Sequence, residues 1–201
     1  MNTLRLLAAA AVLAVSAHGA FAATFDFTDT LRRSSSSFTM SGEDGLTLTV
    51  SGAAYGGAAK TVRTSVGFGL SVGPLFVDNG EFAIFDFDRK VSLTSFVAGF
   101  VDKFDTYRAF VRNGDTFDLI ASGNFGVTNA VGGNKDRATV VFGDAVRAIE
   151  GYSFAIGVGD DGSAVKLRGL SVDPVSQVPV PAAGVMLLSA LGLVALKRRK
   201  A

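Results

Sequence analysis

The chain of 201 residues has no Cys and no Trp, and its single His, His18, lies in an N-terminal segment that we expect to be removed. A body without Cys and His excludes a Ser-His-Asp triad, a Cys-His nucleophile pair and an ordinary zinc site. The absence of Cys also excludes disulfide bonds, so cysteine usage does not indicate the compartment in which the protein works.

Basic residues are also scarce in the body of the chain. The sequence has 19 basic and 18 acidic residues, but five of the basic ones lie at the two ends, namely Arg5, Lys197, Arg198, Arg199 and Lys200. The body therefore contains 14 basic and 18 acidic residues, which gives it a formal charge of −4. Phosphate-backbone binding needs concentrated Lys and Arg, and no such cluster occurs along the body. We therefore expect no nucleic-acid partner.

Residues 1–22 have the three parts of a secretory signal peptide. Arg5 supplies the positive n-region, the run from Leu6 to Val15 supplies the apolar h-region, and Ala20-Phe21-Ala22 supplies small residues at −3 and −1. A buried helix or a retained anchor is the competing interpretation, but the apolar run is too short to span a membrane comfortably. We expect export, with cleavage after Ala22.

From Thr24 onward the hydrophobic pattern has a period of two, which is typical of half-buried strands. Most of these runs are rich in Phe, Val and Thr, which favour a pleated surface. The expected strands lie at Thr24–Asp29, Leu46–Ser51, Phe82–Phe87, Val91–Val101, Tyr107–Arg112, Thr116–Ala121, Ala138–Phe142, Tyr152–Val158 and Ala164–Val172. About nine short strands predict an all-β fold, a single antiparallel β-sandwich or jelly-roll-like domain over residues 23–173.

Local residues refine this prediction. We expect Phe85 and Phe87 to point inward and Asp86 and Asp88 outward, because residues two apart on a strand share a face. Asn113-Gly114 predicts a tight hairpin. Two stretches rich in small residues, Arg32–Ser37 and Gly52–Ala59, are interpreted as loops.

The motifs that could carry chemistry are weak. Residues 157–162 match G-x-G-x-x-G, but the segment that follows is an expected strand rather than the helix that a dinucleotide site needs, so a turn is the better interpretation. Paired carboxylates would suffice for a glycosidase, and Asp86, Asp88, Asp102 and Asp105 are the candidates. An outward polar face accounts for the first two, and the absence of Trp removes the usual sugar platform.

Calcium is the better ligand hypothesis. Asp102 and Asp105 bracket one expected loop, Asp160 and Asp161 lie in another, and residues 78–81 supply Asp, Asn and Glu in a third. Calcium takes six to eight oxygen ligands from such mixed loops. None of these loops has the ladder spacing of an EF-hand. Solvated turn aspartates without a metal are therefore the favoured interpretation of these loops, with calcium as the alternative.

The C-terminal end has three parts after a short linker at residues 174–179. A Pro motif opens it, an uncharged segment of 17 residues (180–196) follows, and four cations close it, Lys197, Arg198, Arg199 and Lys200. The segment would be about 25 Å long as a helix, near the lower limit for spanning a membrane. The cations would stop transfer and keep the tail cytoplasmic, which places the body outside. A buried C-terminal helix is the alternative, although four adjoining cations fit burial poorly.

Val178-Pro179-Val180-Pro181-Ala182, the apolar segment and the basic end together resemble the VPLPA-CTERM sorting signal. This signal belongs to the PEP-CTERM class of exported proteins in Gram-negative bacteria, and the resemblance covers residues 178–201. Val180 stands where the family has Leu. The resemblance implies a membrane-embedded exosortase as partner, which would cleave near the Pro motif, and a link with exopolysaccharide and biofilm.

The body adds a resemblance that bears on fold. Residues 82–87 followed by 91–96 are similar to β-sandwich domains found ahead of such tails, and residues 164–172 resemble their final strand. The combined expectation is a noncatalytic surface or extracellular-matrix protein. Its precursor would be anchored in the inner membrane and face the periplasm, and after processing it would lie at the cell surface or outside. The alternative is a surface-anchored carbohydrate-active enzyme that uses paired aspartates.

Overall fold

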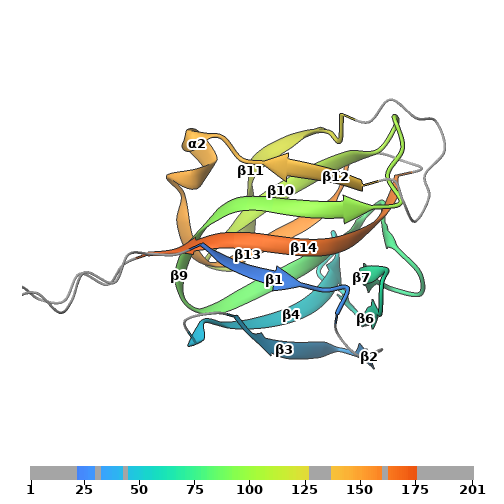
Figure 1. Ribbon diagram of the computed structural model, residues 1–201, viewed down its shortest axis with the longest axis horizontal. Helices are drawn as coiled ribbons and strands as arrows, with labels where there is room; N and C mark the ends of the chain where they lie inside the picture. Colours follow the sequence, from blue (N-terminus) through green and yellow to red (C-terminus); the bar gives the residue numbers. More distant parts are fainter. Residues whose placement is uncertain (1–21, 30–32, 43–44, 127–136, 160–162, 176–201) are drawn as a thin grey trace, which may run out of the picture. The chain divides into compact units, whose positions relative to one another are not determined.

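Antiparallel strands account for almost all of the regular structure in the computed structural model of the chain (Figure 1). It describes residues 22–29, 33–42, 45–126, 137–159 and 163–175. The strands are β1 (Ala23–Asp26), β2 (Arg33–Ser35), β3 (Ser37–Ser41), β4 (Thr47–Ala54), β5 (Ala59–Lys60), β6 (Val62–Ser65), β7 (Gly69–Val72), β8 (Val77–Asp78), β9 (Glu81–Gly99), β10 (Thr106–Asn113), β11 (Thr116–Asn124), β12 (Arg137–Val141), β13 (Glu150–Val158) and β14 (Ala164–Pro174). One short helix, α2 (Asp144–Arg147), joins β12 to β13. The all-β prediction is confirmed.

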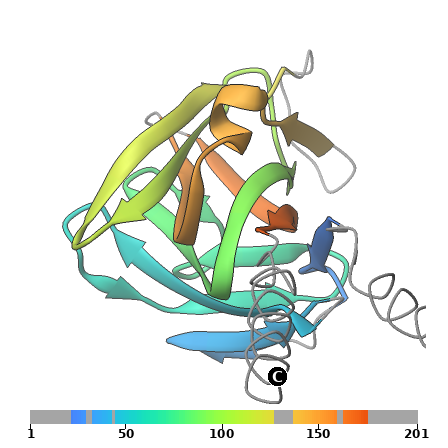
Figure 2. The same ribbon diagram turned by 90° about the vertical axis from the view of Figure 1, so that its left-hand side faces the viewer.

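The central element is β9, whose 19 residues take part in two layers. Its first half pairs with β4 on one edge and with β13 on the other, and β10 and β11 continue the sheet beyond β13. Its second half pairs with β14 and β12. β1, β7 and β8 share the far edge of β14, and β6 and β2 follow β7. The bend in β9 that separates the halves is visible in Figure 2. The arrangement is therefore β-sandwich-like.

The inward faces of both layers share one hydrophobic core. Phe85 on β9 is fully buried, and its ring stacks on Phe27, which follows β1 in the other layer, with 5.8 Å between centroids. Phe25 and Phe87 make a second contact between the layers at 6.0 Å. Burying one such ring contributes about 1.5–3 kcal/mol. These aromatic pairs hold the two layers together.

The alternation predicted for β9 is confirmed. Phe85 and Phe87 are 0% and 6% exposed, whereas Asp86 is partly exposed and Asp88 is exposed. The predicted hairpin is also present, because Asn113 pairs with Thr116 and leaves a two-residue loop. Gly114 has φ 63° in that loop, a backbone conformation that glycine adopts without steric cost.

Three expectations about elements are wrong. Residues 82–87 and 91–101, expected as two strands, belong mostly to the single strand β9. The serine-rich stretch expected as a loop forms β2 and the start of β3, because Ser34 pairs with Arg63 on β6. The small-residue stretch 52–59 contains the end of β4, where Gly52 packs so closely that a Cβ there would lie 2.9 Å from a methyl group of Val72.

The two terminal segments that are expected to direct export and sorting lie outside the described residues. This applies to the signal peptide, apart from Ala22, and to the C-terminal segment 178–201 with its apolar helix. β14 runs through Pro174, one residue past the expected end of the domain. Within the described ranges, no helix has both the length and the apolar character needed to cross a membrane.

Candidate functional site

The outer face of the β14 layer carries a row of cationic and hydroxyl side chains across six neighbouring strands. Cross-strand pairing aligns Ser34 with Arg63, and Arg63 with Ser71. Leu70 pairs with Leu167, so the next residues, Ser71 and Lys166, are also neighbours. Lys166 in turn pairs with Gly99, and Gly99 with Arg137. We call Arg63, Lys166 and Arg137 the cationic row.

Strand alternation explains why this row faces outward. The residues next to its members, Leu70, Leu167 and Ala98, are at most 1% exposed and belong to the core. Successive side chains point to opposite faces, so Ser71, Lys166 and Gly99 must face away from the core. Ser71 is itself only 1% exposed, because it lies at the floor of a cavity on that face.

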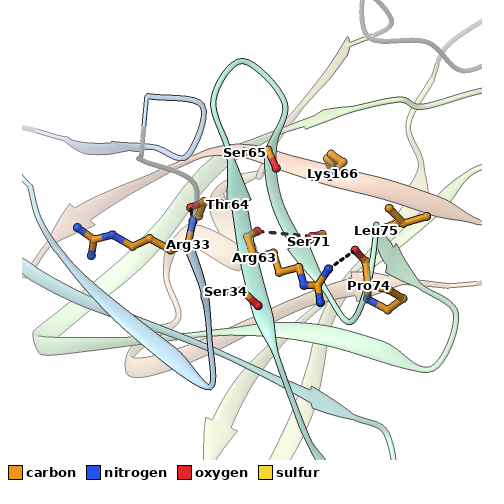
Figure 3. Close-up of a pocket in the computed structure, with 9 residues that line it drawn as sticks. All are labelled: Arg33, Ser34, Arg63, Thr64, Ser65, Ser71, Pro74, Leu75 and Lys166. Carbon is orange, nitrogen blue, oxygen red and sulfur yellow. Dashed lines mark hydrogen bonds between the residues drawn. The ribbon is translucent and has the colours of Figure 1, made fainter.

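The cavity has a volume of about 510 Å³ and lies over β2, β6, β7 and β14 (Figure 3). Arg63 and Lys166 line it together with Ser34, Ser65 and the apolar Leu75, and none of the described residues that line it is a carboxylate. Small-ligand pockets measure about 300–1,000 Å³, so the volume suits a small ligand or one unit of a polymer.

Arg63 is held in place within this cavity. Its Nη1 donates a hydrogen bond of 3.2 Å to the carbonyl oxygen of Pro74, and Ser71 Oγ donates one of 3.5 Å to the Arg63 carbonyl. Figure 3 shows the Arg63 guanidinium turned toward Pro74, whereas the Arg33 side chain extends in the opposite direction. One guanidinium N–H is thus engaged, and the guanidinium carries five in all.

Two features of the fold act in opposite directions on the ammonium group of Lys166. Burial lowers the pKa of Lys166, whereas a cation–π contact, with Nζ 5.4 Å from the centre of the Phe76 ring, favours the charged form. The ion pairs found among the described residues join Lys60 to Glu81, Arg89 to Asp88 and Arg147 to Asp173. None of them neutralises a member of the cationic row.

Arg168 adds a further positive charge next to the row. Its side chain lies over Gly99, where a Cβ would come within 2.6 Å of the Arg168 Cδ, so glycine is required there. Arg168 Nη2 donates a hydrogen bond of 2.6 Å to the carbonyl oxygen of Gly67. Burial and then the charge of Arg137 lower the pKa of Arg168, while Asp26 acts in the opposite direction. Arg168 and Arg137 are therefore close enough to repel each other.

Asp102 and Asp105, expected as calcium ligands, are engaged in holding their loop. Asp105 is 5% exposed; its Oδ2 accepts the backbone N–H of Asp102 at 2.7 Å, and its Oδ1 accepts that of Ala164 at 3.3 Å. Asp102 Oδ1 accepts the N–H of Phe104 at 2.7 Å. Burial raises the pKa of Asp105, although hydrogen bonds from Asp102, Ala164 and Ser163 partly oppose this.

The third carboxylate loop is likewise tied to the fold. Glu81 is 7% exposed and its Oε1 lies 3.2 Å from Lys60 Nζ. Glu81 Oε2 accepts the N–H of Asp78 at 3.4 Å, and burial together with the Glu81 charge raises the pKa of Asp78. Asp160 and Asp161 lie outside the described residues. In the part of the chain that the structure describes, no three acidic or imidazole side chains gather closely enough to hold a metal ion.

Asp86 and Asp88, the candidate glycosidase pair, lie on the outer face of the other layer. Asp86 is opposite Thr49 on β4 and Ser153 on β13, within a sheet surface. Asp88 Oδ1 accepts a hydrogen bond of 3.5 Å from Arg89 Nε. Neither aspartate lines the cavity described above. The structure therefore does not bring the two carboxylates together with the cationic cavity.

Sequence reasoning missed the cationic row. Its members are up to 103 positions apart in the chain, at 63, 137 and 166. Only the strand register brings them together, and no local pattern signals it. The residues of the expected sorting motif, 178–182, and the stop-transfer residues 197–200 lie outside the described residues.

No protein-family model matches the chain, and no curated protein matches it. Function is therefore argued from the residues and the geometry alone.

Proposed function

We propose that the protein is a noncatalytic surface or extracellular-matrix protein whose β-domain binds polysaccharide. The observation that carries this proposal is the chemistry of the cavity. Arg63, Lys166 and Ser65 line it and can hold a polar ligand, while the described part of its lining has no carboxylate to act as acid, base or nucleophile. A site with hydrogen-bond donors and without the carboxylate pair of a glycosidase favours binding over glycoside hydrolysis.

The arrangement of the aspartates also argues against the carbohydrate-active enzyme. A glycosidase needs two carboxyl groups on either side of a bound sugar, about 5–10 Å apart. Asp86 and Asp88 lie along one strand of a sheet surface, and both oxygens of Asp105 accept backbone hydrogen bonds. We find no favourable geometry for acid–base catalysis at these residues.

The proposal places this domain at the cell surface. Residues 1–22 have the parts of a signal peptide, and residues 178–201 resemble a VPLPA-CTERM sorting tail. The domain, as a single β-sandwich or jelly roll, would first be anchored through residues 180–196 with its body in the periplasm. An exosortase-type enzyme would then cleave near Pro179 and Pro181. The processed protein would be located at the cell surface or in the matrix. Its association there is with exopolysaccharide or biofilm.

Affinity electrophoresis tests the binding and catalytic parts of this proposal together. The full-length protein, in mild detergent, is run through gels that contain a neutral polysaccharide (dextran) or an acidic one (polygalacturonate). The same polymers are then assayed for new reducing ends. Retardation by at least one polymer without new reducing ends supports the proposal. Release of reducing ends would establish an enzyme, and unretarded migration in both gels would contradict polysaccharide binding.

A further inference from the structure

We infer that the cationic row is a subsite for a uronate-containing polysaccharide, with the chain lying across strands β6, β7, β14, β9 and β12. This inference rests on the proposed function and names the ligand class that the site takes. Arg63 and Lys166 lie in the cavity, and Arg137 continues the row across Gly99. The occupant is a linear polyanion with hydroxyl groups, and the argument rests on spacing, charge and hydrogen-bonding chemistry.

The spacing of the row suits a repeating charge. One strand separates Arg63 from Lys166, and one strand separates Lys166 from Arg137. Neighbouring strands are about 4.8 Å apart, so successive cations stand roughly 10 Å apart along the row. A single small anion can contact one or two of these groups. A polymer with carboxylates at intervals can contact all three cations at once. Its affinity is higher because the carboxylates belong to one molecule.

The positive charge of this face favours an anionic ligand. The whole body has a formal charge of −4, yet no ion pair within the described ranges neutralises Arg63, Lys166 or Arg137. Arg168 lies beside Arg137, so the cations repel one another. Asp26 offsets part of this repulsion by raising the pKa of Arg168, and its Oδ1 also accepts hydrogen bonds from the N–H and hydroxyl of Thr28. A bound carboxylate would relieve this repulsion and pair with guanidinium groups, which match it with two parallel hydrogen bonds.

Hydroxyl groups beside the cations favour a sugar as the ligand. Ser34 and Ser65 line the cavity beside the cations and can exchange hydrogen bonds with sugar hydroxyls. Leu75, 64% exposed, offers an apolar edge for the C–H face of a sugar ring. Single-stranded nucleic acids bind through aromatic platforms, and the residues described at this cavity include no aromatic side chain.

The test compares two triple variants of the full-length protein that remove equal charge. The first, Arg63→Gln with Arg137→Gln and Lys166→Gln, neutralises the row. The second replaces Lys90, Lys103 and Arg112 by Gln, three exposed cations that do not line the cavity. Binding to a polygalacturonate oligomer is measured by calorimetry, with a dextran oligomer and a single-stranded oligonucleotide as further probes. A thermal melt of each variant checks its folding.

We expect the wild type to bind the uronate oligomer, with affinity falling as salt rises because the contacts are screened. Neutralising the row should weaken this binding by about tenfold or more, since three charge-assisted contacts are lost. The matched control should stay within about threefold of wild type, because none of its three cations lines the cavity. The single variants Arg63→Gln and Arg137→Gln should each give a smaller loss of affinity. Both positions are exposed, so these variants can replace the triple variant if that one is unstable.

Four outcomes overturn the inference. Equal losses in both triple variants would show unspecific attraction, and equal or tighter binding of the oligonucleotide would identify a nucleic-acid site. Binding of dextran but not of the uronate oligomer would end this inference and leave the proposed function standing. Binding of neither sugar would remove both.

Discussion

Replacing Phe85 by Ala tests the layered core at its centre. Phe85 is 0% exposed, stacks on Phe27 from the opposite layer and pairs across β9 with Val50 and Phe154, both fully buried. Losing the ring removes its burial and leaves a cavity between the layers that rigid strands on both sides cannot fill. Such substitutions cost about 3–5 kcal/mol.

The expected effect is large enough to measure directly. For a domain of about 150 residues each kcal/mol shifts the melting temperature by roughly 2–4 °C, so Phe85→Ala should lower it by roughly 6–20 °C. The assay is thermal denaturation of the chain from Ala23 to Ser176, followed by circular dichroism. We expect this fragment to fold alone with a β-type spectrum, because the strands already supply a complete core.

Phe104→Ala is the matched control. Phe104 is 69% exposed, so the same truncation should change stability by no more than about 0.5 kcal/mol. Equal melting temperatures for Phe85→Ala and wild type would refute the inward register of β9. A helical spectrum for the fragment would refute the fold.

The remaining predictions concern the loops and the tail. Burial raises the folded-state pKa of Asp105, so its contribution to stability is present at low pH and is lost as pH rises from about 3.9 through the raised pKa. The difference in unfolding free energy between wild type and Asp105→Asn should therefore fall over that range in denaturant titrations, and a rising difference would show that the hydrogen bonds dominate. Calcium and a chelator should leave the melting temperature unchanged, because backbone N–H groups already occupy both Asp105 oxygens; an upward shift with calcium would revive the metal hypothesis. Changing Pro179 and Pro181 to Ala should leave export and membrane insertion intact but block tail processing, because proline holds the peptide extended for the sorting enzyme. Membrane fractionation and gel size, in hosts with and without an exosortase, give the readout, and normal processing would leave only a plain anchor.

The sequence predicts the fold where a residue's neighbours along the chain decide its environment. The alternation of Phe85, Asp86, Phe87 and Asp88 settles which face of β9 is buried, and Asn113-Gly114 locates a hairpin. The polar residues 88–90 were interpreted as a break between strands. In the structure they lie inside β9, where the strand passes from one layer to the other and is partly open to solvent.

Long-range pairing decides what the sequence does not reveal. Ser34 has little tendency to form a strand, yet β6 provides hydrogen-bond partners for its segment. Gly52 lies in a strand because its missing side chain leaves room for Val62 and Val72. The candidate site depends on the same effect, since only the register of β7, β14 and β9 aligns Arg63, Arg137 and Lys166 in one row.

The central claim is that the protein is exported and sorted to the surface through its tail. Intact-mass measurement of the protein recovered from the cells that produce it tests this most directly, because it locates both ends of the mature chain. We predict a chain that begins at Ala23 and ends near the Pro motif at residues 178–182. A mass that includes both residues 1–22 and the basic end at 197–201 would contradict export and sorting together.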